Sequence, residues 1–167
     1  FTRELNSTKL VHNKNGNAML KLSKLTDYAT VILSHMAKDY LGMYASQEVS
    51  EGTGIAQPTV SKILKILVKA KILTSVRGAK GGYLLASAPE NITVAMVINA
   101  LEGPIALTEC SLSHKNCDHV RDCDIQGNWG VINQKILTML ESVTLADMLE
   151  PIKPANEIRI SASSFFR

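Results

Sequence analysis

All three cysteines of the chain lie within fourteen residues, at Cys110, Cys117 and Cys123. Gaps of six and five residues separate them, longer than the two-residue gap of a zinc knuckle or a thioredoxin-like pair. The intervening residues are polar and charged, so a hydrophobic core cannot hold this loop in shape. Thiolates bind iron-sulfur clusters, zinc and copper(I), and three of them leave one coordination position for another residue. The spacing favours metal or cluster ligation, with redox-active thiols, or a disulfide plus one spare cysteine, as alternatives.

The length of 167 residues predicts one domain, or one compact domain with an appended element, which is long enough to bury a real core. Its net charge of +3 is mildly basic, so an acidic partner must be met by a local patch. The odd cysteine count, and the lack of a long apolar run or a signal peptide, predict a soluble cytoplasmic protein without a membrane partner. A secreted protein that has lost its leader is the alternative.

The first helix is predicted from apolar residues that recur every three or four positions from Leu25 to Met36. This helix should end near Lys38 and brace the core. Residues 1–18 lack such periodicity and precede Met19, so we interpret them as a leader or a remnant of cloning.

Two short helices joined by a glycine-containing turn are predicted next. Ser46 can cap the first, over residues 47–51, and the run Gly52-Thr53-Gly54 would end it. The second begins near Pro58, and four lysines but no acid lie between Pro58 and Lys71. Its buried stripe should comprise Val60, Ile63, Leu64, Leu67 and Val68. This pattern predicts a helix-turn-helix, and the alternative is an ordinary amphipathic helix with a solvated lysine face.

A hairpin with a glycine-rich turn is predicted after these helices, from strands at residues 72–77 and 83–85. A helix-turn-helix followed by such a hairpin is a winged helix. A nucleotide-phosphate loop is disfavoured because the Walker spacing and a directly following helix are both absent.

The start of the second helix and the wing supply the candidates for contact with double-stranded DNA. They are Gln57, Thr59, Ser61, Lys62, Lys65, Arg77 and Lys80. Gln57, Ser61 and Lys62 are predicted on base edges, because glutamine can pair with adenine and lysine with guanine. Thr59 and Lys65 are predicted on phosphates, whereas the wing residues could reach the minor groove.

A long helix is predicted from about Asp124 to Ser142, because apolar residues are spaced by four and three from Ile125 to Val143. So narrow an apolar seam favours packing against another helix, which predicts a homodimer. The alternative is that the helix folds back on its own domain. Thr93 can cap the helix that precedes the cysteine loop. The run Thr144-Leu145-Ala146-Asp147 resembles a capping box and predicts one more short helix.

The predicted fold is therefore mainly α with a small β wing: a winged helix-turn-helix plus a long C-terminal dimerisation helix. The expected organisation is residues 1–18 (leader or remnant), 19–106 (winged helix-turn-helix DNA-binding domain), 107–124 (cysteine cluster-binding loop), 125–150 (dimerisation helix and a short helix) and 151–167 (tail).

From about Met19 to Leu149, the chain resembles the IscR and NsrR family of bacterial iron-sulfur transcription regulators. Three features carry this resemblance: Leu25-Thr26-Asp27-Tyr28-Ala29, Val76-Arg77-Gly78-Ala79-Lys80-Gly81-Gly82-Tyr83, and three cysteines ahead of a long helix. Three further runs most resemble the branch that regulates the SUF cluster-assembly operon: Glu102-Gly103-Pro104, Thr108-Glu109-Cys110 and Thr144-Leu145-Ala146-Asp147-Met148.

The resemblance implies a homodimer whose cluster is held by three cysteines and one other ligand. In the IscR branch that ligand is a histidine three residues after the last cysteine, where this chain has Gln126. In NsrR-like members it is an aspartate from the first helix of the other subunit, and Asp27 matches that position. The predicted ligands are thus Cys110, Cys117, Cys123 and Asp27, with Gln126, His114 and His119 as alternatives. A 2Fe-2S cluster is expected in preference to 4Fe-4S.

The resemblance also implies a DNA-binding transcription regulator that senses iron-sulfur status and controls SUF genes, with no small-molecule substrate. A nitric-oxide or redox-sensing repressor of the same family, and a zinc-stabilised DNA-binding protein, are the alternatives. An enzyme is not expected, because no Cys-x-x-Cys pair occurs and no cysteine and histidine are placed to act as nucleophile and base.

Overall fold

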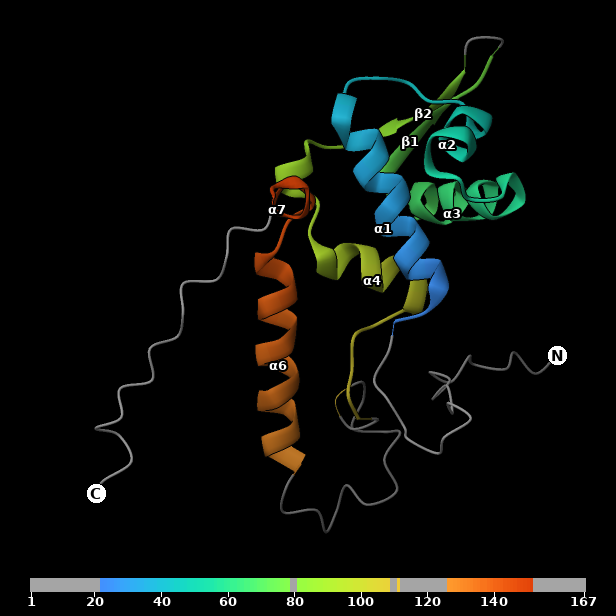
Figure 1. Ribbon diagram of the computed structural model, residues 1–167. Coiled ribbons are helices and arrows are strands. Elements are labelled where there is room, and N and C mark those ends of the chain that lie inside the picture. Colours follow the sequence, from blue (N-terminus) through green and yellow to red (C-terminus); the bar gives the residue numbers. More distant parts are fainter. Residues whose placement is uncertain (1–21, 79–80, 109–110, 112–125, 152–167) are drawn as a thin grey trace, which may run out of the picture.

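A computed structural model of the chain describes residues 22–78, 81–108, 111 and 126–151. This part is mainly helical with a small two-stranded sheet, as predicted (Figure 1). The elements are α1 (Lys24–Met36), the 3-10 helix η1 (Ala37–Asp39), α2 (Ser46–Thr53), α3 (Gln57–Lys69), β1 (Leu73–Val76), β2 (Gly82–Leu85), the 3-10 helix η2 (Pro89–Asn91), α4 (Val94–Glu102), α6 (Gln126–Ser142) and α7 (Leu145–Leu149). The expected leader lies outside the described residues, as does the tail beyond Pro151.

Helix α2 differs from its prediction at both ends. Its N-cap is Ala45, whose amide donates to the Glu48 carboxylate at 3.3 Å, so Ser46 is the first helical residue and not the cap. The helix also continues through Gly52, where a β-carbon would lie only 2.3 Å from Cε1 of the His35 ring. Glycine at this position lets α1 and α2 pack closely, and α2 ends at Gly54, whose φ is 70°.

The wing is an antiparallel pair in which Leu73 lies opposite Leu85 and Val76 lies opposite Gly82. The segment before α2 also joins the wing, since the backbone groups of Tyr44 and Tyr83 exchange hydrogen bonds of 2.8 and 2.9 Å. Strand β2 is therefore fixed to the segment that leads into the helix-turn-helix.

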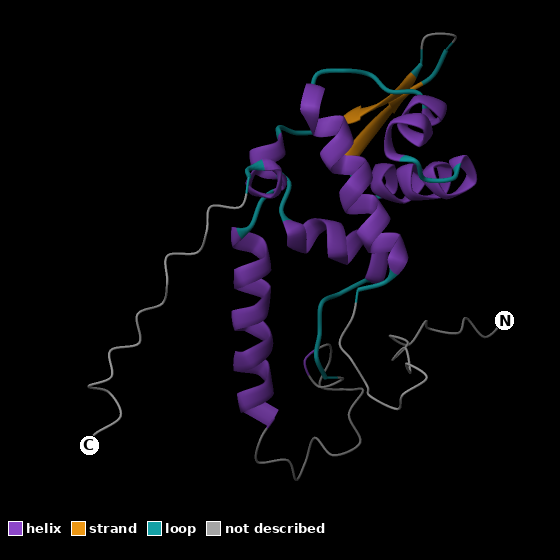
Figure 2. Ribbon diagram, viewed as in Figure 1, coloured by secondary structure: helices purple, strands orange, loops and turns teal. Residues whose placement is uncertain are grey.

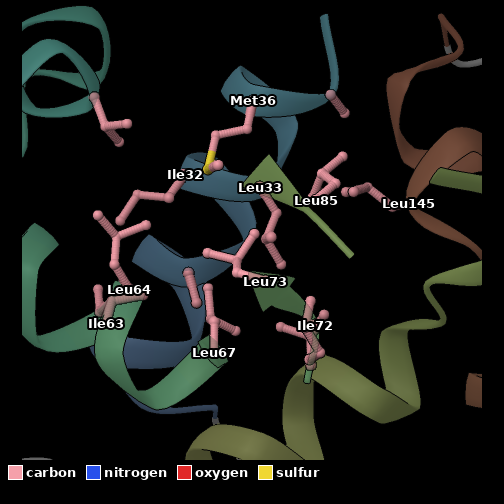
Figure 3. Packing of buried hydrophobic residues seen from close by; sticks show 14 of the residues in the cluster. Ile32, Leu33, Met36, Ile63, Leu64, Leu67, Ile72, Leu73, Leu85 and Leu145 are labelled. Carbon is pink, nitrogen blue, oxygen red and sulfur yellow. The ribbon is translucent and has the colours of Figure 1, made fainter. Parts of the chain in front are cut away.

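The hydrophobic core lies where α1, α3, the sheet and α7 meet (Figure 3). The predicted stripe of α3 is buried at Val60, Ile63, Leu64 and Leu67, while Val68 is only partly buried. Further large core side chains come from the other elements: Ile32, Leu33, Met36, Ile72, Leu73, Leu85 and Leu145.

Helices α4 and α7 are capped as predicted and are joined by backbone hydrogen bonds. The Thr93 hydroxyl accepts from the Met96 amide, and Thr144 and Asp147 form a capping box. The Leu145 amide donates to the Ile92 carbonyl at 2.7 Å. The end of α6 is thereby attached firmly to the winged helix.

Helix α6 projects away from the rest of the described structure (Figure 2). It begins at Gln126, close to the predicted Asp124, and ends at Ser142 as predicted. From Asn128 to Ser142, every described side chain is exposed or only partly buried.

Candidate DNA-binding surface and cluster-binding region

The turn between α2 and α3 is closed by local hydrogen bonds. The Ser50 hydroxyl donates to the Ile55 carbonyl at 2.7 Å, and the left-handed Gly54 reverses the chain. Ile55 is buried beneath the turn. These contacts fix the orientation of α3 relative to α2, which is the requirement for a recognition helix.

The predicted DNA-contacting residues of α3 are accessible to different degrees. Gln57, Lys62 and Lys65 are exposed, whereas Thr59 and Ser61 are partly buried. The N-cap of the helix is Ala56, which provides no side-chain capping hydrogen bond, and Pro58 lies in the first turn. A duplex can therefore approach the N-terminal end of α3 without displacing a capping side chain.

The wing places Arg77 in an exposed position directly after β1. Lys80, the other predicted wing contact, lies outside the described residues. The sequence from Gly52 to Pro89 contains no acidic residue, but it carries six basic ones: Lys62, Lys65, Lys69, Lys71, Arg77 and Lys80. The helix-turn-helix and wing therefore form a locally positive region, although the whole chain is only mildly basic.

Of the predicted cluster ligands, the structure describes only Asp27. Cys110, Cys117 and Cys123 lie outside the described residues, as do His114 and His119; Gln126 begins α6, but its side chain is not described. Among the described residues, no three potential metal ligands gather. The structure therefore does not test the predicted ligand set as a whole.

Asp27 lies in the first turn of α1 with an exposed side chain. Within the described part of the chain, its carboxylate accepts no hydrogen bond and forms no ion pair, which leaves both oxygens accessible to a ligand. It borders an open cavity of about 630 Å³ between α1, α4 and α7, which is also lined by Thr30, Ile98 and Met148. Asp27 is therefore an exposed carboxylate at the rim of a cavity.

The start of α1 is joined to the end of α4 by Glu102. Its carboxylate accepts a hydrogen bond of 2.9 Å from the Ser23 amide and another from the Thr26 hydroxyl. Partial burial alone would raise the pKa of Glu102, but the hydrogen bonds from Ser23 and Thr26 together hold this pKa below its usual value. The first turn of α1, which carries Asp27, is thus bonded to the last residue of α4, the helix that precedes the cysteine loop in the sequence.

Asn133 of α6 makes a second contact with this connection. Its Oδ1 accepts from the Leu107 amide at 3.0 Å, and its Nδ2 donates to the Ile105 carbonyl at 3.2 Å. Nothing in the sequence distinguished Asn133 from other polar helix residues. Glu102 stands out in the sequence only as part of the Glu102-Gly103-Pro104 run, whereas the Ser-Lys-Leu-Thr sequence that begins at Ser23 is a signal for the cap of α1.

The described structure defines a class of protein, because a helix-turn-helix with an exposed basic recognition helix and an attached hairpin is a winged helix of the DNA-binding type. The family follows from comparison with known proteins. Residues 22–151 match the Rrf2 family, described as iron-dependent transcriptional regulators. This chain therefore belongs to the Rrf2 family.

Individual relatives agree with this assignment. The chain is 31% identical over 145 residues to protein rrf2 of Nitratidesulfovibrio vulgaris, a match that covers 85% of this chain and 97% of the relative. Its structure is similar to CymR, the global cysteine regulator of B. subtilis, with a TM-score of 0.60 and 28% identity, covering 78% of this chain and 97% of CymR. It is also similar to IscR of T. potens, with a TM-score of 0.57 and 30% identity, covering 78% of this chain and 86% of IscR.

These findings confirm the predicted family resemblance and winged-helix fold. The relatives are transcriptional regulators and not enzymes, which agrees with the expectation from the sequence. Transcription regulation follows from family membership, and this membership also supports DNA binding. Within the described ranges, no helix is both long enough and apolar enough to cross a lipid bilayer.

Proposed function

We propose that this chain is a dimeric, sequence-specific transcription regulator that reads double-stranded DNA and senses iron-sulfur status. The observation that carries the proposal is the exposed, acid-free basic region of α3 and the wing, in a chain of the iron-dependent Rrf2 family. In this proposal the controlled genes are those of iron-sulfur cluster assembly of the SUF type, the branch that the sequence most resembles. The protein acts in the cytoplasm.

In this function α3 enters the major groove and the wing follows the adjacent backbone. Gln57, Ser61 and Lys62 read base edges near the start of α3, while Thr59 and Lys65 contact phosphates. Arg77 and Lys80 extend the contact from the wing. Family membership and the exposure of Gln57, Lys62, Lys65 and Arg77 support these roles.

Matched lysine substitutions test the division between base and phosphate contacts. Lys62→Ala should cost about 1–3 kcal/mol of binding to the preferred duplex and relax its sequence preference at one position. Lys65→Ala should weaken binding to matched and scrambled duplexes alike and flatten the dependence on salt. Equal effects of both substitutions on matched and scrambled duplexes would contradict the assignment.

Cys110, Cys117 and Cys123 of one subunit, with Asp27 of the partner subunit, are the proposed ligands of an iron-sulfur cluster, 2Fe-2S in preference to 4Fe-4S. Soft thiolates suit iron, and a carboxylate supplies a weaker fourth ligand that leaves the site labile. The accessible carboxylate of Asp27 supports its part in this set. A cluster, when bound, cross-links its thiolate ligands and can be lost to oxidants, which suits a sensor.

The second subunit is proposed to pack on α6. The large apolar side chains of this helix remain exposed in the single chain, including Trp129, Val131, Ile132 and Met139. A two-fold dimer would place two recognition helices about one turn of DNA, roughly 34 Å, apart. The loop that carries the cysteines leads into α6, so the shape of this loop can influence the spacing between the two recognition helices.

A cysteine-responsive or redox-responsive regulator without a cluster is the second candidate, favoured by the similarity to the cysteine regulator CymR. Anaerobic purification with an absorption spectrum and counts of iron and sulfide separates the two. A brown protein with iron and sulfide supports the cluster, a colourless zinc protein supports a zinc-stabilised regulator, and a metal-free protein supports the thiol-based candidate. Loss of the cluster on exposure to nitric oxide, with derepression of genes unrelated to SUF, would favour the gas-sensing alternative.

Binding to DNA is then measured on a duplex that the loaded protein selects from a randomised library. The proposal predicts different affinities for the loaded and iron-free forms. If a Cys110→Ser, Cys117→Ser, Cys123→Ser protein and the loaded wild type bind this duplex equally, the sensing function is wrong.

A further inference from the structure

The five residues between Glu102 and Thr108 connect α4 to the cysteine loop and form neither helix nor strand. This connecting segment, residues 103–107, is held near both ends. Before it, Glu102 is hydrogen-bonded to the start of α1; near its other end, Ile105 and Leu107 are hydrogen-bonded to Asn133. The segment therefore links α1 to α6 through described contacts.

Asn133 binds the segment as a neighbouring β-strand would. One side-chain amide satisfies a backbone N–H and a backbone C=O two residues apart, at 3.0 and 3.2 Å. Because a primary amide carries both an acceptor and a donor, it fixes the position and the direction of the backbone together. Aspartate offers only acceptors when ionised, and alanine offers neither.

The packing around this contact is loose. A cavity of about 350 Å³ lies between α4 and α6, lined among others by Met96, Ile105 and Leu137. Several residues near α6 have no described side chain. Among hydrogen bonds whose partners are both described, Asn133 is the only side chain of α6 that bonds to a residue outside the helix. The position of the segment on α6 thus depends on two directed hydrogen bonds more than on close hydrophobic packing.

We propose that Asn133 is a positioning residue that couples the connecting segment, and with it the first turn of α1, to α6. The proposal rests on the proposed function, in which the ligands follow at Cys110 and α6 pairs the subunits. In this proposal the connecting segment is the main route by which a change in the cysteine loop alters the relation between the winged helix and α6, and loss of Asn133 interrupts that route. Cluster binding and DNA binding then both persist but become independent of each other.

The test compares Asn133→Ala with Gln134→Ala, which removes an exposed polar side chain from the next position of the same helix. Each full-length protein is reconstituted anaerobically with ferrous iron and sulfide, and its loading is verified by iron counts and visible circular dichroism. Dissociation constants for the selected duplex are then measured for the loaded and iron-free forms. Wild type and Gln134→Ala should show a ratio of affinities in the range of about five- to 150-fold. Asn133→Ala should bring this ratio to within about twofold of one.

Asn133→Asp provides a graded second variant, because it can still accept from the Leu107 amide but cannot donate to the Ile105 carbonyl. Its ratio of loaded to iron-free affinity should lie between the ratios of wild type and Asn133→Ala. A general weakening of α6 does not predict this graded series. If Asn133→Ala fails to fold or to load, Asn133→Asp decides the matter, and an unchanged ratio overturns the proposal. Amide exchange at Leu107 should accelerate in Asn133→Ala even in the iron-free protein.

The outcomes separate this inference from the function on which it rests. A loaded wild type and an iron-free wild type that bind equally overturn the sensing function, and the coupling with it. A wild-type ratio that Asn133→Ala retains in full overturns the coupling alone.

Discussion

The winged helix and α6 use similar apolar residues in opposite ways. Ile32, Leu33, Leu64 and Leu67 are fully buried where α1 and α3 meet, whereas Val131 and Met139 of α6 are 56% and 59% exposed. Both regions show a helical apolar pattern in the sequence, but among the described residues only the winged helix buries that pattern. Apolar residues concentrated on one exposed helix indicate an interaction site. The contrast suggests that the winged helix is completed by its own fold and α6 by a second subunit.

Truncation of a core residue should give the largest effect. Leu33→Ala removes a fully buried side chain from the centre of the core and should lower the free energy of unfolding by about 2–5 kcal/mol. Urea unfolding followed by circular dichroism measures this loss. The Val31 side chain lies on the opposite face of the same helix and is 43% exposed, so Val31→Ala should change stability by about 0.5 kcal/mol or less. A similar loss in both variants would show that the winged helix is not packed as described.

A charge on α6 should affect association and leave the fold unchanged. Ile132→Glu should shift the protein from dimer to monomer and weaken binding to the selected duplex at least about tenfold, or about 1.4 kcal/mol, because two half-sites can no longer be held together. Sedimentation and a DNA shift assay measure both effects, and the far-ultraviolet circular dichroism should remain that of wild type. Gln134→Glu places the same charge elsewhere on α6 and should retain the dimer. A stable dimer of Ile132→Glu would remove α6 from the interface.

The junction between the two regions should respond to pH. The pKa of Glu102 is lower in the folded protein than in the unfolded chain, so its stabilising effect is complete above the unfolded pKa of about 4.3 and is lost as the pH falls through the folded value. Because Glu102 is largely solvent-exposed, Glu102→Gln should cost only about 0.5–1 kcal/mol at pH 7. The difference from wild type should shrink as the pH falls from about 5 to 3.

Urea unfolding across that pH range tests this sign. Glu90→Gln, which replaces an exposed carboxylate on η2, serves as the control and should change stability little at any pH. A difference between wild type and Glu102→Gln that grew toward acid would contradict the arrangement of hydrogen bonds at the start of α1.

Much of the winged helix could be predicted from the sequence, since its elements obey local rules. The period of the buried stripe in α3, the caps at Thr93 and Thr144, and the glycines of the wing all act within a few residues. The contacts that connect regions could not be predicted in this way. Glu102 meets Ser23 across 79 positions and Asn133 meets Leu107 across 26, and no local pattern indicates either pairing.

Two local details were also not predictable, because they depend on tertiary packing. Lys71 adopts a φ of 62°, a conformation in which glycine would ordinarily be expected, where the chain turns from α3 into β1. Gly52 is predicted to break α2, but it lies within the helix, where the absence of a β-carbon leaves room for the His35 ring. The predicted ligand set at Cys110, Cys117 and Cys123 stays a prediction, since it lies outside the described residues.

The same substitution at two helical glycines should give small effects of opposite sign. A β-carbon at Gly52 would lie 2.3 Å from His35, whose ring also packs edge-on against Tyr44, so Gly52→Ala should destabilise the protein by about 1 kcal/mol. No atom lies within 4 Å of the β-carbon position at Gly130 of α6, and this residue is outside the apolar seam. Gly130→Ala should therefore stabilise the helix by about 0.5–1 kcal/mol. Thermal unfolding of both variants at one protein concentration tests this pair. A loss in Gly130→Ala, with a weakened dimer, would mean that the partner subunit also contacts this side of α6.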